Sequence, residues 1–261
     1  MPIAVCGYTV RYHGFNKEQV ESTYKKIAEM GYDGPEGSLG RRYMSVEEDL
    51  ALLNKYGLKV CDAYGDLTKP DEAMENASKY GVKVFGIGAI PGEMMISADG
   101  FKAYADRMNE LAKPFEGTGF RLQYHNHSQE FRNFPELNGK TGYALLIENT
   151  NPDVIAFQLD THWTAAAGAD PAAWIRKLKG RIPIVHFKDY AIDNYSYDVG
   201  LGNVIKRFAE IGQGNINWTA VKEACEFAGV EWYSVEQDRS YMNEFDSLKI
   251  SIDFMKSIGI K

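Results

Sequence analysis

The sequence has little cysteine, and the cysteines it has are scattered. Three occur in 261 residues, Cys6, Cys61 and Cys225, with no CxxC pair among them. An odd count without paired spacing argues against a disulfide framework and fits a reducing compartment, so we expect a cytoplasmic protein. The lack of cysteine near the polar strand ends described below also argues against a metal site built from thiolates.

Long apolar runs, a leader-like start and an excess of positive charge are absent as well. No apolar run approaches the ~20 residues that span a bilayer, and the opening residues MPIAV lack the basic and long apolar regions of a signal peptide. The formal net charge is −7 at pH 7, whereas nucleic acids are bound by basic surfaces. We therefore expect neither a membrane nor a nucleic acid as partner.

Short apolar runs alternate with amphipathic segments along the whole chain. The segments carry apolar residues at helical spacing, as at Val20, Tyr24 and Ile27, and several begin at a capping residue such as Ser45 or end at a glycine such as Gly57. The eight apolar runs cover residues 3–8, 31–33, 59–63, 82–90, 119–124, 154–159, 182–187 and 231–235.

This alternation predicts the fold class. Strands separated by helices form parallel sheets, because a crossover helix returns the chain to the same edge of the next strand. The length is close to the ~250 residues typical of a closed barrel, and no GxGxxG follows the first strand to support an open dinucleotide-binding sheet. We therefore expect an α/β fold with a single (β/α)8 TIM-barrel domain over residues 1–261. The long stretch 188–214 is expected to cover the carboxyl face, with a short helix around 204–211.

The polar residues that end the apolar runs predict the active site, since in such barrels it lies at the carboxyl ends of the strands. Four of the five histidines fall at the ends of the fifth, sixth and seventh runs. Strand alternation lets His125 and His127 both face the barrel mouth. Asp160, His186 and Glu236 are each the first polar residue after an apolar strand. A set of nitrogen and carboxylate ligands suits one divalent ion, Mn²⁺, Mg²⁺, Co²⁺ or Zn²⁺.

Structural roles remain open for the other polar residues near these strand ends. Asp189 and Asp238 can cap helices or loops, and Glu36 can hold the turn at 34–37. Trp163 can pack in the core instead of stacking against a bound sugar. The glycine-rich stretch 212–215 fits a turn leading into a helix better than a phosphate cradle. No arginine cluster marks a phosphate site in the sequence, which favours an unphosphorylated sugar.

At these positions the chain resembles the sugar phosphate isomerase/epimerase branch of the xylose-isomerase-like barrels, a group similar to ketose 3-epimerases, inosose dehydratase and endonuclease IV. The resemblance extends over nearly the whole chain. It is carried by YTVR at 8–11, HNHSQEF at 125–131, LDTHW at 159–163, HFKD at 186–189, IGQG at 211–214 and VEQD at 235–238.

The resemblance implies a ligand set and also a departure from it. In the related ketose epimerases the metal is held by Glu, Asp, His and Glu from strands 5 to 8. The last three match Asp160, His186 and Glu236, whereas His125 stands at the strand-5 position. Because the two glutamates of those relatives are also the proton-transfer pair, the second proton-transfer group here has to be another residue, Glu130 or His127.

The resemblance also implies the chemistry, proton abstraction next to a carbonyl through an enediolate, which isomerises or epimerises a sugar. Glu236 is the expected base and Lys188 the group that polarises a substrate oxygen. The expected substrate-binding residues are Tyr8, Arg11, Glu36, Trp163, His162 and Asp238, of which His162 replaces the aromatic residue usual at its position.

Three other functions compete with this one. A keto-sugar or keto-inositol dehydratase, or a 3-keto-glycoside lyase, would use the same site, and a non-catalytic sugar-binding barrel stays open because of His125. An abasic-site endonuclease would need a richer histidine cluster for several metal ions and a basic face. The chain has five histidines and a net charge of −7, which disfavour that function. A small carbohydrate is the expected partner, and the sequence leaves open whether the protein is a homo-oligomer.

Overall fold

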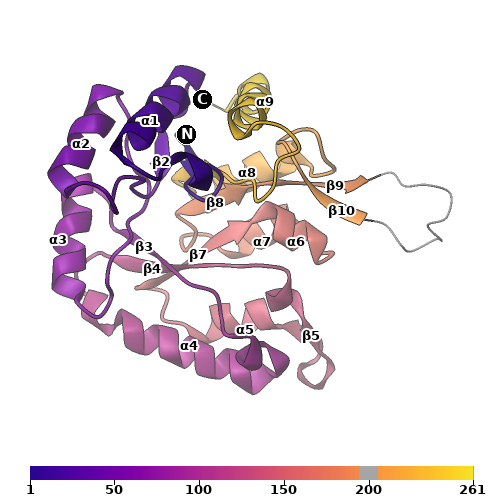
Figure 1. The fold of residues 1–261 in the computed structure, drawn as a ribbon. Helices are drawn as coiled ribbons and strands as arrows, with labels where there is room; N and C mark the ends of the chain where they lie inside the picture. The colour runs from indigo at the N-terminus through magenta and orange to yellow at the C-terminus, as the bar shows by residue number, and fades with distance from the viewer. Residues whose placement is uncertain (194–204, 261) are drawn as a thin grey trace.

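Seven parallel strands curl into one sheet in the computed structural model, which describes residues 1–193 and 205–260 (Figure 1). Their spatial order is β2-β1-β11-β8-β7-β4-β3, and every neighbouring pair is parallel. The strands are β1 (Ile3–Cys6), β2 (Gly34–Glu36), β3 (Val84–Ile87), β4 (Arg121–His125), β7 (Ile155–Asp160), β8 (Ile184–Phe187) and β11 (Trp232–Val235).

The segment 59–63 lies between β2 and β3, the two ends of this sheet. The Lys59 backbone N–H donates to the Asp33 carbonyl (2.9 Å) and that of Ala63 to the Val84 carbonyl (2.8 Å). A Cβ added at Gly34 would lie 1.7 Å from the Lys59 carbonyl oxygen, so only glycine allows the two backbones to approach so closely. The segment therefore occupies the eighth position of the predicted (β/α)8 barrel without pairing regularly enough to be a strand.

The second predicted strand is displaced along the chain. Gly31, with φ of 90°, ends the first helix in the left-handed conformation, and the Tyr32 backbone N–H still donates back to the Ile27 carbonyl (3.1 Å), so the chain is leaving the helix where the strand was expected. The strand begins only at Gly34.

Helices surround the sheet, as Figure 1 shows. They are α1 (Lys17–Met30), α2 (Val46–Lys55), α3 (Pro70–Tyr80), α4 (Ala98–Ala112), α5 (Gly142–Asn149), α6 (Thr161–Ala166), α7 (Pro171–Lys177), α8 (Trp218–Ala228) and α9 (Glu244–Ser257). Short 3-10 turns occur at η1 (Arg11–His13), η2 (Gly92–Ile96), η3 (Lys113–Phe115), η4 (Gln129–Phe131) and η5 (Pro135–Leu137). The expected cap at Ser45 is present as a full capping box with Glu48. Within the described residues, no helix has the length and apolar character that a membrane span requires.

Two small antiparallel pairs extend from the barrel. One joins β5 (Asn133–Phe134) to β6 (Lys140–Thr141), and the other joins β9 (Asp189–Asp193) to β10 (Ile205–Ala209). The helix predicted around 204–211 is therefore wrong over its described residues, because 205–209 are extended and pair residue by residue with 189–193. Residue 204 lies outside the described residues.

The base of the β9–β10 hairpin packs beside α6. The Phe208 ring stacks on His162 with centroids 4.4 Å apart, and it meets Trp163 edge-on at 5.5 Å. Because α6 begins directly after β7, this contact places the base of the hairpin at the carboxyl ends of β7 and β8, as expected for the loop from 188 to 214. The hairpin projects away from the barrel (Figure 1).

Candidate metal centre and active site

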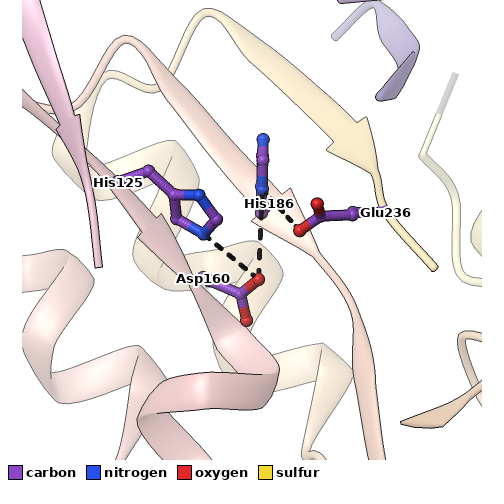
Figure 2. Close-up of side chains that lie close together, drawn as sticks. All are labelled: His125, Asp160, His186 and Glu236. Carbon is purple, nitrogen blue, oxygen red and sulfur yellow. Dashed lines mark hydrogen bonds and ion pairs between the residues drawn. The ribbon is translucent and has the colours of Figure 1, made fainter. Parts of the chain in front are cut away.

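The four predicted ligands converge at the carboxyl ends of four neighbouring strands (Figure 2). His125 ends β4, Asp160 ends β7, His186 lies near the end of β8, and Glu236 follows β11. Their ligand atoms lie within 4.8 Å of one another. His125 Nε2 is 3.4 Å and His186 Nδ1 3.9 Å from Asp160 Oδ2, and His186 Nδ1 is 2.9 Å from Glu236 Oε2.

Two of these atoms have no hydrogen-bond partner among the described residues. Asp160 Oδ2 and His125 Nε2 are both buried without one, whereas Asp160 Oδ1 accepts a bond from the Trp163 backbone N–H (2.8 Å). Leaving a buried polar atom unsatisfied costs about 1–3 kcal/mol, so such atoms usually have a role. A divalent cation between them would satisfy both, and the set of two imidazoles and two carboxylates fits such an ion.

Glu36 orients the His186 ring through a hydrogen bond at Nε2. Its carboxylate accepts from His186 Nε2 (2.7 Å), from Gln158 Nε2 (2.9 Å) and from the Ser234 hydroxyl. A hydrogen bond at Nε2 leaves Nδ1 as the nitrogen that faces Asp160 and Glu236, the arrangement by which a carboxylate fixes a metal-binding histidine. Burial alone would lower the pKa of His186, but Glu36 and Glu236 outweigh it and raise that pKa well above its usual value.

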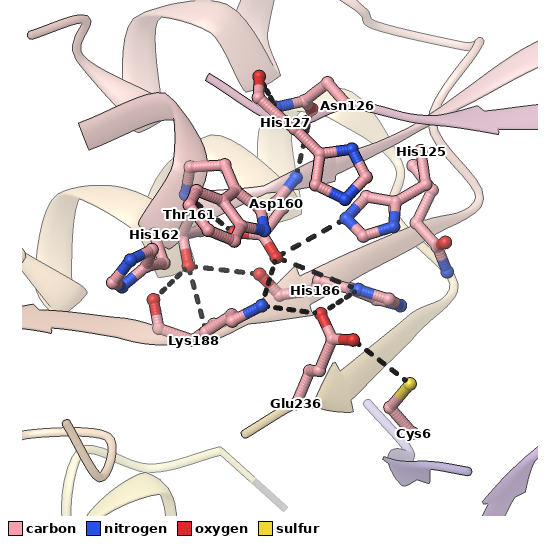
Figure 3. Close-up of polar contacts among 12 residues, drawn as sticks. Cys6, His125, Asn126, His127, Asp160, Thr161, His162, His186, Lys188 and Glu236 are labelled. Atoms are coloured by element: carbon pink, nitrogen blue, oxygen red, sulfur yellow. Dashed lines mark hydrogen bonds and ion pairs between the residues drawn. The ribbon is translucent and has the colours of Figure 1, made fainter. Parts of the chain in front are cut away.

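Lys188 places a buried cation among the carboxylates (Figure 3). Its Nζ lies 3.4 Å from Asp160 Oδ2, 3.1 Å from Glu236 Oε2 and 2.7 Å from Asp238 Oδ2. Burial opposes its charge, but these three carboxylates outweigh burial and raise the pKa of Lys188. The ammonium group is therefore protonated and fixed beside two of the proposed ligands.

A cysteine does lie in the site, contrary to the expectation from sequence. Cys6 ends β1, and its thiol donates to Glu236 Oε1 at 3.7 Å. Burial, together with Glu36 and Glu236, raises the pKa of Cys6, so the sulfur stays protonated and acts as a donor. The sequence concealed this contact because it joins residues 230 positions apart, which meet only when β1 pairs with β11.

The two candidates for the second proton-transfer group lie in different surroundings. Glu130 is buried, and its carboxylate accepts from the Tyr124 hydroxyl and from the His127 backbone N–H (2.9 Å), so it holds the turn after β4. His127 lines the cleft, with its ring 4.9 Å from His125. Burial and the neighbouring His125 lower the pKa of His127, which keeps its ring neutral near pH 7.

A cleft of about 550 Å³ opens above these residues. Of the residues expected to bind substrate, Tyr8, Glu36 and Asp238 line it. Sequence reasoning missed further wall residues, Asp62, Tyr64, Gln158 and the segment 86–88. Asp62 could have been noticed in the sequence, because it is an acidic residue within the run 59–63, which was read as apolar. Burial and Glu36 raise the pKa of Asp62, and its Oδ1 is buried without a hydrogen-bond partner.

Three other residues expected to bind substrate lie beside the cleft, outside its described lining. His162 Nδ1 is 2.7 Å from the Asp189 carbonyl oxygen, and the ring stacks on Phe208. Trp163 is half-buried, with its ring centroid 5.0 Å from Lys188 Nζ. Arg11 donates to the carbonyls of Tyr8 (2.6 Å) and Asp238 (2.8 Å), so it ties together two parts of the rim.

Asp189 explains the glycine-rich stretch at 212–215. Its carboxylate accepts from the backbone N–H groups of Gly212 (2.9 Å) and Gly214 (3.1 Å) and from Trp218 Nε1 (2.7 Å). A Cβ at Gly214 would lie 2.2 Å from that carboxylate. The stretch therefore holds an internal carboxylate where it leads into α8, which agrees with the interpretation as a turn.

Comparisons with known proteins agree with this architecture. Residues 24–258 match the family described as the xylose isomerase-like TIM barrel. An inosose dehydratase from Mesomycoplasma hyopneumoniae is 23% identical over 273 residues, covering 91% of this chain and 88% of the relative.

Two solved structures share the fold. A sugar phosphate isomerase/epimerase from Parabacteroides distasonis superposes with a TM-score of 0.78 at 20% identity, covering 99% of this chain and 94% of that one. A xylose isomerase-like TIM barrel protein from Mycobacterium smegmatis in complex with magnesium gives 0.68 at 13% identity, covering 99% and 96%. Because the family match spans most of the chain and the barrel carries its polar residues at the strand ends, the protein belongs to the xylose isomerase-like TIM barrel family.

Proposed function

We propose that this enzyme is a metal-dependent sugar isomerase or epimerase that removes a proton from the carbon next to a carbonyl. The observation that carries the proposal is a pair of buried atoms that make no hydrogen bond within the described part of the chain, Asp160 Oδ2 and His125 Nε2, 3.4 Å apart. A divalent ion held by His125, Asp160, His186 and Glu236 would polarise the carbonyl and stabilise the enediolate.

The side chains around this centre supply two proton-handling groups. Glu236 lines the cleft as a carboxylate, since Lys188 and His186 outweigh burial and lower its pKa well below the usual value. His127 lines the cleft as a neutral imidazole. The rings of His125 and His186 lie between Glu236 and His127. The His125 ring contacts the rings of both His127 and His186, and His186 in turn contacts Glu236. Removal by one group and return by the other would invert a carbon centre.

A dehydratase reaction is a second candidate, and Lys188 favours it. After a base removes the proton next to the carbonyl, the bond between the β-carbon and its oxygen breaks, and an ammonium beside the site can protonate the leaving oxygen to water. Lys188 is such an ammonium, buried within 3.4 Å of the ligand carboxylates. The inosose dehydratase relative supports the same candidate.

Isotope exchange with a panel of ketoses and inososes tests the proposal. In D₂O the metal-loaded wild type should place deuterium on a carbon next to the substrate carbonyl. Glu236→Gln should keep the fold and lose at least ~10²-fold in turnover, the usual contribution of a general base. Glu231→Gln, at the exposed start of the same strand region, is the matched control and should leave turnover unchanged. Metal content is measured on every sample, because a lost ion would mimic a lost base.

The product and the residual exchange decide between the alternatives. A product of unchanged mass supports the isomerase or epimerase, and a product that has lost one water supports the dehydratase. Exchange that survives unchanged in Glu236→Gln would assign the base to His127. Normal turnover without deuterium incorporation, with or without bound metal, would overturn the enediolate mechanism.

A further inference from the structure

A second hollow adjoins the cleft and differs from it in composition. It encloses about 340 Å³ and shares Tyr8 and Tyr64 with the active-site cleft. We call it the rim groove and define it by Tyr8, Arg11, Arg41, Arg42, Tyr43 and Tyr64. A further hollow of about 470 Å³ continues past Arg41 and Arg42. The rim groove therefore extends the cleft away from the metal centre.

Exposed aromatic rings are concentrated in this groove. Tyr8, Phe15, Tyr43 and Tyr64 all line it and are between 41% and 57% exposed. Isolated exposed rings are ordinary on protein surfaces, but a contiguous group of them usually marks a binding site. The rings also fix the cations, because the Arg11 guanidinium lies 4.0 Å above the Tyr8 ring and that of Arg41 lies 4.1 Å above Tyr64.

The groove is positive although the chain is negative. It is lined by three arginines, and none of its described wall residues is Asp or Glu, whereas the whole chain carries a net charge of −7. The sequence showed no arginine cluster, because Arg11 lies 30 residues from Arg41 and the two meet only where the segments after β1 and β2 come together. The expectation of an unphosphorylated sugar, which depended on the lack of such a cluster, loses its support.

The donors of these arginines are unequally used. Arg11 donates to two backbone carbonyls, and Arg41 donates once, to the Ser38 carbonyl at 3.3 Å. Among the described residues, Arg42 has no hydrogen-bond or ion-pair partner. A neutral sugar offers hydroxyl donors as well as acceptors, but this wall supplies guanidinium donors and no carboxylate to accept from those hydroxyls. Guanidinium groups match carboxylates and phosphates, which are acceptors alone.

We propose that the rim groove binds an anionic group, a phosphate or a carboxylate, carried by the substrate at the end remote from its reacting carbonyl. Arg41 and Arg42 bind the anion, and the aromatic rings pack against the chain of the substrate that leads to it. The inference rests on the proposed function for the position of the carbonyl, which the metal centre would hold.

Binding of three probes to the metal-loaded protein tests this site. D-Fructose 6-phosphate, D-fructuronate (a ketose with a carboxylate at its far end) and D-fructose are titrated calorimetrically at low and moderate KCl. We expect at least one anionic probe to bind ~10-fold or more tightly than D-fructose, and the two anionic arms identify which group the groove prefers. The preference should weaken as salt rises. In the double variant Arg41→Gln, Arg42→Gln it should disappear while the affinity for D-fructose stays unchanged. Arg42→Lys should retain part of it, and Arg176→Gln on the outer helix α7 should retain all of it.

Three outcomes would overturn the inference. In the first, the double variant weakens the binding of all three probes equally, which would show that the groove contributes shape and no recognition of charge. The preference survives in the double variant, which would place the anion elsewhere, for instance on the metal. The double variant changes the oligomeric mass and not the preference, which would make the groove a contact between copies of the chain. Deuterium exchange is recorded on the same variants, so a failure of the metal-centre proposal appears there, separately from the anion preference.

Discussion

Glu36→Gln separates the role that the structure gives Glu36 from the one that the sequence suggested. The side chain keeps its size, but one carboxylate oxygen becomes an N–H donor. Both oxygens of Glu36 lie near His186 Nε2, at 3.0 and 2.7 Å, and their other neighbours are the Gln158 amide nitrogen and the Ser234 hydroxyl. In either orientation the new amide nitrogen therefore faces His186.

That contact changes the tautomer of His186. To avoid two opposed donors, the imidazole has to accept at Nε2 and carry its proton on Nδ1, the nitrogen that faces Asp160 and Glu236. Loss of such a supporting carboxylate costs about 10- to 100-fold in metal affinity, or about 1.4–2.7 kcal/mol. We expect a loss in this range for Mn²⁺ and Zn²⁺, with turnover recovered at saturating metal.

Competition against a chelating dye measures the metal affinity, with Glu18→Gln on the exposed face of α1 as the matched control. The control should bind metal as the wild type does. An unchanged metal affinity in Glu36→Gln combined with a collapse of turnover that added metal does not rescue would refute the reasoning. Glu36 would then act on the substrate, as the sequence suggested.

Three further predictions concern charge in and near the cleft. Lys188→Met should tighten metal binding, because it removes a cation 3.1–3.4 Å from Glu236 and Asp160, yet it should lower the free energy of unfolding of the metal-free protein by about 3–5 kcal/mol in chemical denaturation. The raised pKa of His186 keeps it protonated in the metal-free protein at neutral pH, so metal affinity should rise with pH up to that pKa, and calorimetry in two buffers at pH 7 should detect about one proton released per ion. The raised pKa of Asp62 means that the folded state favours the neutral form of this carboxyl group. Its contribution to the free energy of unfolding is therefore lost as pH rises from about 4 through the folded pKa. In EDTA, Asp62→Asn should show a smaller fall in Tm from pH 5 to pH 8 than the wild type. An equal fall in both proteins would show that Asp62 is not neutral in the fold.

The convergence of the proposed ligands was predictable from sequence because each position depends on local pattern and topology alone. Asp160, His186 and Glu236 follow apolar runs, and parallel strands in a barrel bring their carboxyl ends to one rim. The pairing of β9 with β10 was not predicted, because each strand is only five residues long and neither 189–193 nor 205–209 alternates cleanly between apolar and polar residues.

Contacts between distant parts of the chain could not be predicted from the pattern. Glu36 meets His186 across 150 positions, and Cys6 meets Glu236 across 230. Both contacts depend on the order in which strands pair around the barrel and on which side chains point inward at that register. The same limit applies to the rim groove, where Arg11 and Arg41 are brought together by two loops whose shapes the sequence does not specify.

The charges of the site account for how its carboxylates stay ionised while buried. Asp160, Glu236 and Glu36 are at most 6% exposed, and three buried negative charges would be prohibitive without compensation. Lys188 and protonated His186 supply two positive charges in direct contact with them. If a divalent ion were bound by His186, the imidazole would give up its proton to coordinate it, so the change in positive charge would be smaller than the charge of the ion. Lys188 keeps its proton because its pKa is raised, so it would remain a fixed cation beside Asp160 and Glu236. The same two cations that keep these carboxylates ionised in the fold would therefore adjust to the ion of the proposed mechanism in different ways, His186 by losing its charge and Lys188 by keeping it.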